Sequence, residues 1–146
     1  MVNLDFLSVI DEKSQLLIDT SRYLWENPEL AFTEFKSAKY LCDVLRAEDF
    51  QVEENLADIP TAFSGRFGTG KPVIGILGEF DALYGLNQVA GITEKKSMGG
   101  EAGHGCGHNL LGTAALGAAI EYLYETGRNE QLSVNKIEFY TENQYM

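Results

Sequence analysis

Helical periodicity marks the first part of the chain. From about Leu4 to Glu26, apolar residues return at the spacing of one helix face. Pro28 ends this helix, because the residue before a proline is pushed away from helical backbone angles. We expect the next helix to start after Thr33, a favourable N-cap residue. Its expected core face consists of Ala38, Leu41, Cys42 and Leu45.

After position 49 the pattern changes to that of strands. Short segments at 50–53 and 61–67 precede a near-continuous apolar run at 72–78, which predicts a strand buried on both faces. A long glycine-rich loop, from about 81 to 106, then leads into a helix expected over 107–126, with Gly127 as its C-cap. A last strand is expected over 134–140. The inward side of the long helix is expected to carry Leu110, Leu111, Ala114, Ala118 and Leu123.

This order of elements predicts an α/β protein with a mixed β-sheet flanked by helices, the sheet lying between helix layers. Internal repeats, low-complexity tracts and Pro/Ser-rich linkers are absent from the sequence. The sequence therefore shows no domain boundary.

Composition and charge narrow the function classes. The 146 residues are 45% hydrophobic and 11% aromatic, which is enough apolar material for a folded core. Asp and Glu number 22 against 11 Lys and Arg, a formal net charge of −11. Nucleic acids and anionic membrane surfaces attract basic patches, so neither is an expected partner. Two cysteines are too few for a disulfide framework, and no secretory signal opens the chain, which predicts a cytoplasmic protein.

Metal-ligand residue types gather at 103–109, where the long loop meets the expected helix. Both histidines of the chain, His104 and His108, flank Cys106 and alternate with glycines. Thiolate and imidazole are donors that zinc-like divalent metals prefer, and a helix N-terminus favours the thiolate. The glycines let the backbone bend tightly enough for neighbouring side chains to reach one ion. We therefore predict a metal site that Cys106 and His108 share.

Two other interpretations fit the same residues. A glycine-rich turn with an incidental thiol and two surface imidazoles would need no ligand. In the other, Cys106 is a nucleophile with His104 or His108 as its base, although catalytic Cys/His pairs usually meet across a fold. The gathering of both histidines around one cysteine favours metal binding.

Carboxylates follow the apolar strand. Strand alternation puts Glu79 and Asp81 on the same side, at the strand end where open α/β sheets place their sites. One of them is expected to orient a ligating histidine, and the alternative is a pair of solvated loop acids. Near the end of the chain, Glu142 is interpreted as a solvated acid rather than a metal ligand.

Taken together, these segments resemble the aminoacylase/carboxypeptidase family of dinuclear metallohydrolases. The most similar branch is that of the amidohydrolases, which includes hippurate hydrolases, indole-acetyl-amino-acid hydrolases and aminobenzoyl-glutamate hydrolase subunits. Residues 25–34 are similar to the early NPEL segment of the family, and 78–83 to its DMDAL strand end. Residues 105–109 match its CGHD/N motif. The resemblance runs from about 16 to 140, and the ordered set is more specific than any one motif.

The resemblance implies a site, a cofactor and a reaction. Cys106 and His108 would be metal ligands, and Asp81 the strand-end acid that supports the metal site in catalysis. The complete enzyme would hold two divalent ions, zinc or manganese, with nickel and cobalt as further options. It would hydrolyse the amide bond of a small N-acyl-amino acid or peptide. A glutamate would carry the proton of the attacking water to the leaving amine.

One part of the family pattern is missing. After the strand corresponding to 136–140, the family carries a PAEE-like turn whose glutamates act as general base and metal ligand. The corresponding places fall near Tyr145 and Met146. Residues 1–146 are therefore expected to form a partial catalytic domain, without the lid domain that dimerises, and to be inactive alone. The alternative is a non-catalytic binding or interaction protein built on the same half-domain, which would associate, as a homo-oligomer or with a partner, through an exposed sheet edge.

Overall fold

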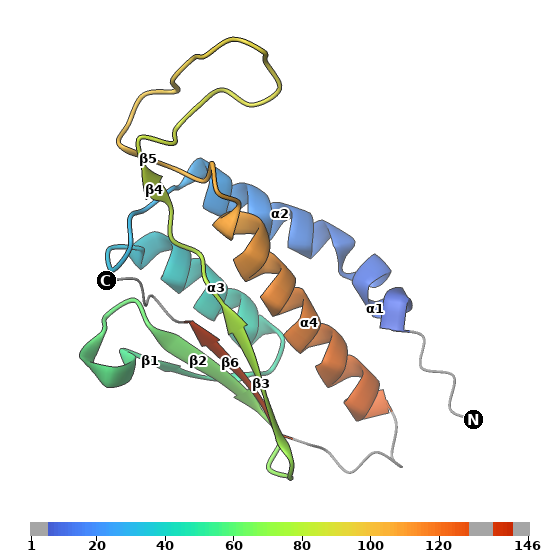
Figure 1. The fold of residues 1–146 in the computed structure, drawn as a ribbon. Helices are drawn as coiled ribbons and strands as arrows, with labels where there is room; N and C mark the ends of the chain where they lie inside the picture. The colour runs from blue at the N-terminus through green and yellow to red at the C-terminus, as the bar shows by residue number, and fades with distance from the viewer. Residues whose placement is uncertain (1–5, 129–135, 142–146) are drawn as a thin grey trace.

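The structure is a computed structural model that describes residues 6–128 and 136–141. A mixed four-stranded sheet carries helices against one of its sides (Figure 1). The α/β class predicted from the sequence is confirmed. The α-helices in these two ranges all lie on that one side, so the expected second helix layer is not seen within them. Glu142, Tyr145 and Met146 lie outside the described residues.

The helices begin and end close to the predicted positions. The first expected helix is divided at Lys13, where φ is −94° and ψ is 3°, into α1 and α2. The second part ends immediately before Asn27 and Pro28, as the proline rule predicts. The longest helix continues through Gly127, so the expected C-cap at this glycine is wrong. The helices are α1 (Phe6–Glu12), α2 (Ser14–Glu26), α3 (Phe35–Ala47), the short 3-10 helix η1 (Leu56–Asp58) and α4 (His108–Arg128).

The sheet has the strand order β1-β2-β6-β3. The first two neighbouring pairs are antiparallel, whereas β6 and β3 run parallel to each other. A separate two-stranded ribbon, β4 with β5, closes the base of the long loop that projects from the molecule in Figure 1. The bounds are β1 (Gln51–Glu54), β2 (Phe63–Phe67), β3 (Val73–Gly78), β4 (Leu83–Tyr84), β5 (Ala102–Gly103) and β6 (Lys136–Thr141).

The core lies between the sheet and two helices. α3 packs over β1 and β2, while α4 packs over β3 and β6 and carries α2 on its other side. The predicted core face of α3 is confirmed, since all four of its residues are buried. None of the helices in the described part of the chain is long and apolar enough to cross a membrane.

The buried side of α4 differs from the predicted one. Leu110 and Leu111 are 62% and 46% exposed, and Ala114 and Ala118 also face solvent. Only Leu123 of the predicted set is buried. The first turns of α4 consist almost wholly of small and apolar residues, so they contain no polar face that would fix the phase. The side turned inward carries Gly112, Ala115, Leu116, Ala119 and Ile120.

β3 is covered on one face only. Ile74 and Ile76 turn toward the helices, while Val73 and Leu77 on the other face are 48% and 49% exposed. The prediction of a strand buried on both faces is therefore wrong for the described residues. A continuous apolar run is typical of a strand with two covered faces, but here α4 covers one.

Candidate metal centre

The candidate site lies at the carboxyl end of β3. The chain leaves this strand at Gly78, passes through the projecting loop, and returns through α4 to β6, which pairs parallel to β3. In such a strand–helix–strand unit, the strand end and the N-terminus of the crossover helix open on the same crevice. Glu79 and Asp81 lie just beyond the strand, and His108 is the first residue of α4.

Three side chains meet there. Nδ1 of His108 lies 2.7 Å from Oδ1 of Asp81, and its Nε2 lies 3.4 Å from Oε2 of Glu79. One ligand atom from each of the three residues falls within 4.8 Å of the others, close enough for one ion. The side chains are 22%, 15% and 20% exposed for His108, Asp81 and Glu79, so the cluster is accessible but partly withdrawn from water.

The backbone around the cluster is held by a segment far away in sequence. The amide of Ala82 donates to the carbonyl of Glu29 at 2.7 Å, and Leu30 forms an isolated parallel bridge with Ala82. On the other side, a Cβ at Gly112 would lie 2.9 Å from the carbonyl oxygen of Glu79. Glycine at this position therefore allows α4 to approach the strand end that carries the acids.

Glu29 also anchors the start of α3. Its carboxylate accepts the backbone N–H groups of Lys36 and Ser37 at 3.0 and 2.9 Å, and the hydroxyl of Ser37 at 3.0 Å. Thr33, the expected N-cap, instead donates its hydroxyl to the carbonyl of Leu30 at 2.8 Å. The capping prediction for Thr33 is therefore wrong, because a carboxylate from the preceding loop takes that role.

A further carboxyl group, which is not part of the cluster, lies within electrostatic reach of Asp81. Glu34 is fully buried. Burial raises its pKa, hydrogen bonds from Thr61 and from the backbone oppose this, and the nearby charge of Asp81 adds to the increase. The sequence indicates only that Glu34 belongs near the start of a helix, and no local pattern marks it as buried.

His104 and Cys106 do not join the cluster of three. His104 is 3% exposed, and burial together with the nearby His108 lowers its pKa, against smaller opposing effects of Asp81 and the Leu24 carbonyl. Cys106 is a free, exposed thiol. Cys42 is buried, and burial raises its pKa to about 12, which agrees with the apolar role predicted for it.

Asn109, the next residue after His108, anchors the beginning of α4. Its side-chain amide donates to Oγ of Ser21 in α2 at 3.2 Å. Of the predicted site residues, the fold thus brings Asp81 and His108 together with Glu79, the second carboxylate that the sequence offered as a partner for a ligating histidine. Cys106 lies outside this group. Glu29 forms a hydrogen bond with Ala82, which is distant in sequence. Its position in the NPEL-like segment is the one sequence feature that could have marked it as important.

Fold and cluster together define an α/β protein with a carboxylate–imidazole site suited to a divalent metal. No family model matches the chain. Over 112 residues the chain is 51% identical to one of the subunits of the p-aminobenzoyl-glutamate hydrolase of Escherichia coli (strain K12), and the match covers 76% of this chain and 23% of the relative. It is 30% identical to thermostable carboxypeptidase 2 of Saccharolobus solfataricus, covering 75% of this chain and 28% of the relative.

A solved structure supports the same relationship. A dinuclear metal-binding peptidase of the M20 family from Bacillus subtilis superposes with a TM-score of 0.69 at 25% identity, covering 87% of this chain and 34% of that chain. The chain belongs to the aminoacylase/carboxypeptidase family of dinuclear metallohydrolases, as its motifs predicted. It spans about a quarter of the length of the curated relatives it matches. These relatives bear the names of hydrolases and peptidases, so the non-catalytic alternative is not favoured.

Proposed function

We propose that the chain forms part of a metal-dependent amidohydrolase that cleaves the amide bond of an N-acyl-amino acid or short peptide. The observation that carries the proposal is the convergence of Glu79, Asp81 and His108 within 4.8 Å at the end of β3. The 51% identical relative is named for p-aminobenzoyl-glutamate, which makes this compound the first substrate to test.

The spacing of the cluster fits a divalent ion. Two ligand atoms that each lie about 2.1 Å from a tetrahedral metal are separated by roughly 3.4 Å. Nε2 of His108 and Oε2 of Glu79 are 3.4 Å apart. These two atoms would hold the ion, and Cys106 would supply a further ligand, as the family resemblance implies. A divalent ion bound there would polarise the amide carbonyl and supply an activated water.

Asp81 positions the ligand in this proposal. Its carboxylate accepts the Nδ1 proton of His108 across 2.7 Å, which leaves the Nε2 lone pair directed away from Asp81. A carboxylate in this position fixes the ring tautomer and raises the basicity of the ligating nitrogen. The two carboxylates also place excess negative charge around one imidazole, which favours a cation over a neutral ligand.

Both carboxylates of the described cluster, those of Glu79 and Asp81, already contact His108. The cluster contains no third carboxylate that could serve as the proton-transferring base. We therefore propose that the 146-residue chain binds the metal but does not turn over substrate without further residues. We propose zinc or manganese as the metal. The imidazole and carboxylate suit both ions, and a thiolate would favour zinc.

The test is calorimetric titration of the purified chain with Zn²⁺ and with Mn²⁺, followed by an assay of p-aminobenzoyl-glutamate hydrolysis. His108→Gln is expected to abolish saturable binding, whereas Glu94→Gln, which removes an exposed loop acid, is expected to leave it unchanged. Equal metal affinity of His108→Gln and the parent chain would refute the site. Metal-dependent hydrolysis by the chain alone would refute the proposed need for further residues.

A further inference from the structure

A groove of about 670 Å³ opens between α2 and α4. Figure 1 shows the two helices side by side, and residues from the second half of α2 and the first two turns of α4 line the groove. Most of its wall is apolar. Ile18 on α2 and Leu110 on α4 belong to this wall, yet they are 51% and 62% exposed. Large apolar side chains gathered around one open groove indicate a surface that binds a partner.

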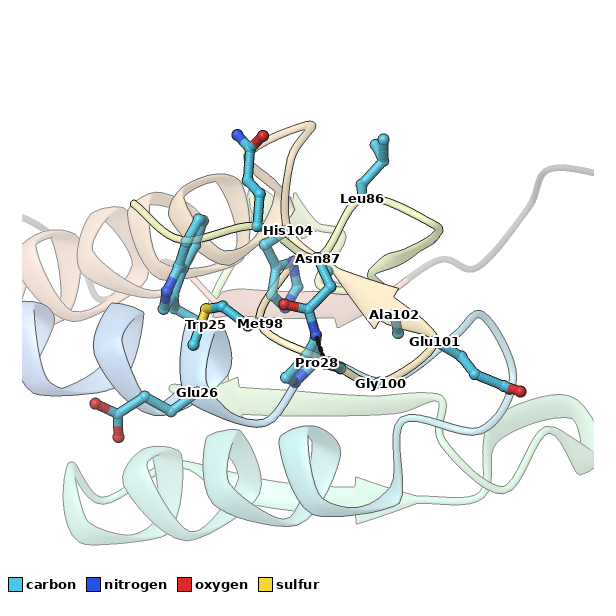
Figure 2. A pocket seen from close by; sticks show the side chains of 13 residues that line it. Trp25, Glu26, Pro28, Leu86, Asn87, Met98, Gly100, Glu101, Ala102 and His104 are labelled. Carbon is cyan, nitrogen blue, oxygen red and sulfur yellow. Dashed lines mark hydrogen bonds between the residues drawn. The ribbon is translucent and has the colours of Figure 1, made fainter. Parts of the chain in front are cut away.

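Trp25 lies at one end of the groove and also lines a second hollow, of about 320 Å³. Figure 2 shows this hollow, between the end of α2 and the loop that joins β4 to β5. Its lining includes the acidic residues Glu26 and Glu101, whereas none of the described residues that line the groove is acidic. An apolar surface therefore fits the groove better than it fits the hollow of Figure 2.

Arg22 is the charged residue among those that line the groove. Its guanidinium lies 3.9 Å from the carboxylate of Asp19, one turn earlier on α2, and the two side chains are 62% and 49% exposed. Asp19 also accepts a hydrogen bond from Gln15 at 3.0 Å. An exposed ion pair at such a distance contributes little to stability, so both charges remain available to a partner.

The patch formed by the groove and these side chains is complementary to itself. An interface with two-fold symmetry places the same patch on both copies, so each protrusion needs a hollow, and each charge an opposite charge, within that one patch. Ile18 and Leu110 protrude beside the groove. Asp19 and Arg22 carry opposite charges. When two α2 helices lie antiparallel about an axis between positions 20 and 21, position 19 of each copy faces position 22 of the other.

We propose that this patch is the interface of a homodimer. Ile18 and Leu110 of each copy pack against the groove of the other, and Asp19 of each copy pairs with Arg22 of the other. The interface contains none of the three residues of the metal cluster, so the inference does not rest on the proposed function. It also lies on a different part of the molecule from the sheet edge through which the sequence predicts association.

The first test is sedimentation equilibrium of the 146-residue chain over a wide range of concentration. A monomer–dimer equilibrium is expected, with a dissociation constant on the order of micromolar, at the weak end of the range for protein interfaces. The measurement is repeated with Leu77→Lys, which places a charge on the exposed face of β3 and so suppresses association through that face. The equilibrium is expected to persist in Leu77→Lys. In His108→Gln, which affects the metal centre, the dissociation constant should stay within about a factor of two.

Ile18→Glu and Leu110→Glu test the apolar part of the interface. Both side chains are exposed, so the substitutions do not threaten folding, and circular dichroism checks this. Each should weaken dimerisation by about tenfold or more, because a carboxylate would be buried against the groove. Ile92→Glu is the matched control, since Ile92 is 45% exposed on the projecting loop and does not line the groove. It is expected to leave dimerisation unchanged.

Charge reversal tests the pairing across the two-fold axis. Arg22→Asp and Asp19→Arg each place like charges opposite one another twice, so each variant alone should dimerise about tenfold more weakly. Mixed in equal amounts, the two variants restore both ion pairs between the copies and should associate nearly as tightly as the parent chain. Asp19→Arg also lowers the net negative charge, so overall repulsion could not explain its weaker dimerisation.

Three results would each overturn the proposal. One is a monomer at every concentration in Leu77→Lys, which would leave the groove to a different partner. The second is dimerisation that Ile18→Glu and Leu110→Glu do not weaken. The third is a mixture of the two charge variants that associates no more tightly than either variant alone. Failure of the metal titration, by contrast, would leave the homodimer untouched.

Discussion

Nδ1 of His108 and Oδ1 of Asp81 lie 2.7 Å apart, although 27 positions separate the two residues in sequence. The contact joins the end of β3 to the first turn of α4 across the whole of the projecting loop. It also decides which ring nitrogen of His108 is available to an incoming ion. The affinity of the candidate metal centre for a metal ion should therefore depend on Asp81, even if Asp81 does not bind the ion directly.

Replacement of Asp81 by asparagine tests this dependence. An amide can present either its oxygen or its N–H₂ group to Nδ1, so the tautomer is no longer fixed and the ring loses basicity. We expect metal affinity to fall by about 10- to 100-fold, the usual effect of removing such a partner. Calorimetric titration measures it. Asp58→Asn, at an exposed left-handed position that asparagine tolerates, is the control. An unchanged affinity in Asp81→Asn would contradict the positioning role.

Glu79 and Cys106 are expected to affect metal choice differently. Glu79→Gln removes a carboxylate that suits zinc and manganese alike, so both affinities should fall to a similar extent. Cys106→Ser removes a soft thiolate and should weaken zinc more than manganese. The measurement is a competition titration with both ions. A zinc-to-manganese affinity ratio that Cys106→Ser leaves unchanged would argue that the thiol lies outside the metal centre.

Glu29→Gln should destabilise the protein. The substitution keeps the shape of the side chain but weakens three charge-assisted hydrogen bonds at the start of α3. We expect the free energy of unfolding in urea to fall by about 1–2 kcal/mol. Glu94→Gln, on the exposed loop, should change it very little. A loss no larger than that of the control would show that the start of α3 is held mainly by packing.

Glu34 should give the stability an unusual pH dependence. Its folded-state pKa is raised above the ordinary value of 4.5 mainly by burial, so the folded protein binds more protons than the unfolded chain between these two values. The contribution of Glu34 is most favourable below pH 4.5 and is lost as pH rises through the raised pKa. Glu34→Gln should therefore gain stability relative to the parent chain as pH increases. Urea unfolding at several pH values measures the difference, and a constant difference across them would contradict the assignment.

The bare face of β3 should promote self-association. β3 is an edge strand of the described sheet, and Val73 and Leu77 expose apolar side chains on it. We expect light scattering on the parent chain to show a molar mass that rises with concentration. Leu77→Lys should reduce the rise, whereas Leu83→Lys, at a side chain 40% exposed on β4, should not. A monomer at every concentration would remove the basis for this expectation.

Sequence reasoning succeeded where chemistry is local. Pro28 ended a helix, and the face of α3 around Leu41 was buried. Asp81 and His108, which the motifs single out, lie in contact, while their roles in a metal site stay predictions. It failed where packing decides. The first turns of α4 are uniformly apolar, so the sequence could not show which side of this helix faces the core. That side is set by the close approach of Gly112 to the end of β3 and of Gly117 to Leu17. Nor could the sequence show that Glu29 would replace Thr33 at the start of α3.

The place of β6 in the sheet has a consequence for the order of assembly. β6 is the last described strand in sequence, yet it lies between β2 and β3, and all of α4 separates it from its parallel neighbour. During synthesis, β2 and β3 therefore emerge before β6, the strand that lies between them and pairs with both. Until β6 is made, each of these two strands has one edge whose backbone hydrogen-bonding groups have no partner strand. Contacts of such long sequence separation form slowly. Other chains could pair with these edges before β6 is synthesised. We therefore expect the completion of the sheet, rather than the collapse of the helices, to limit the yield of folded protein.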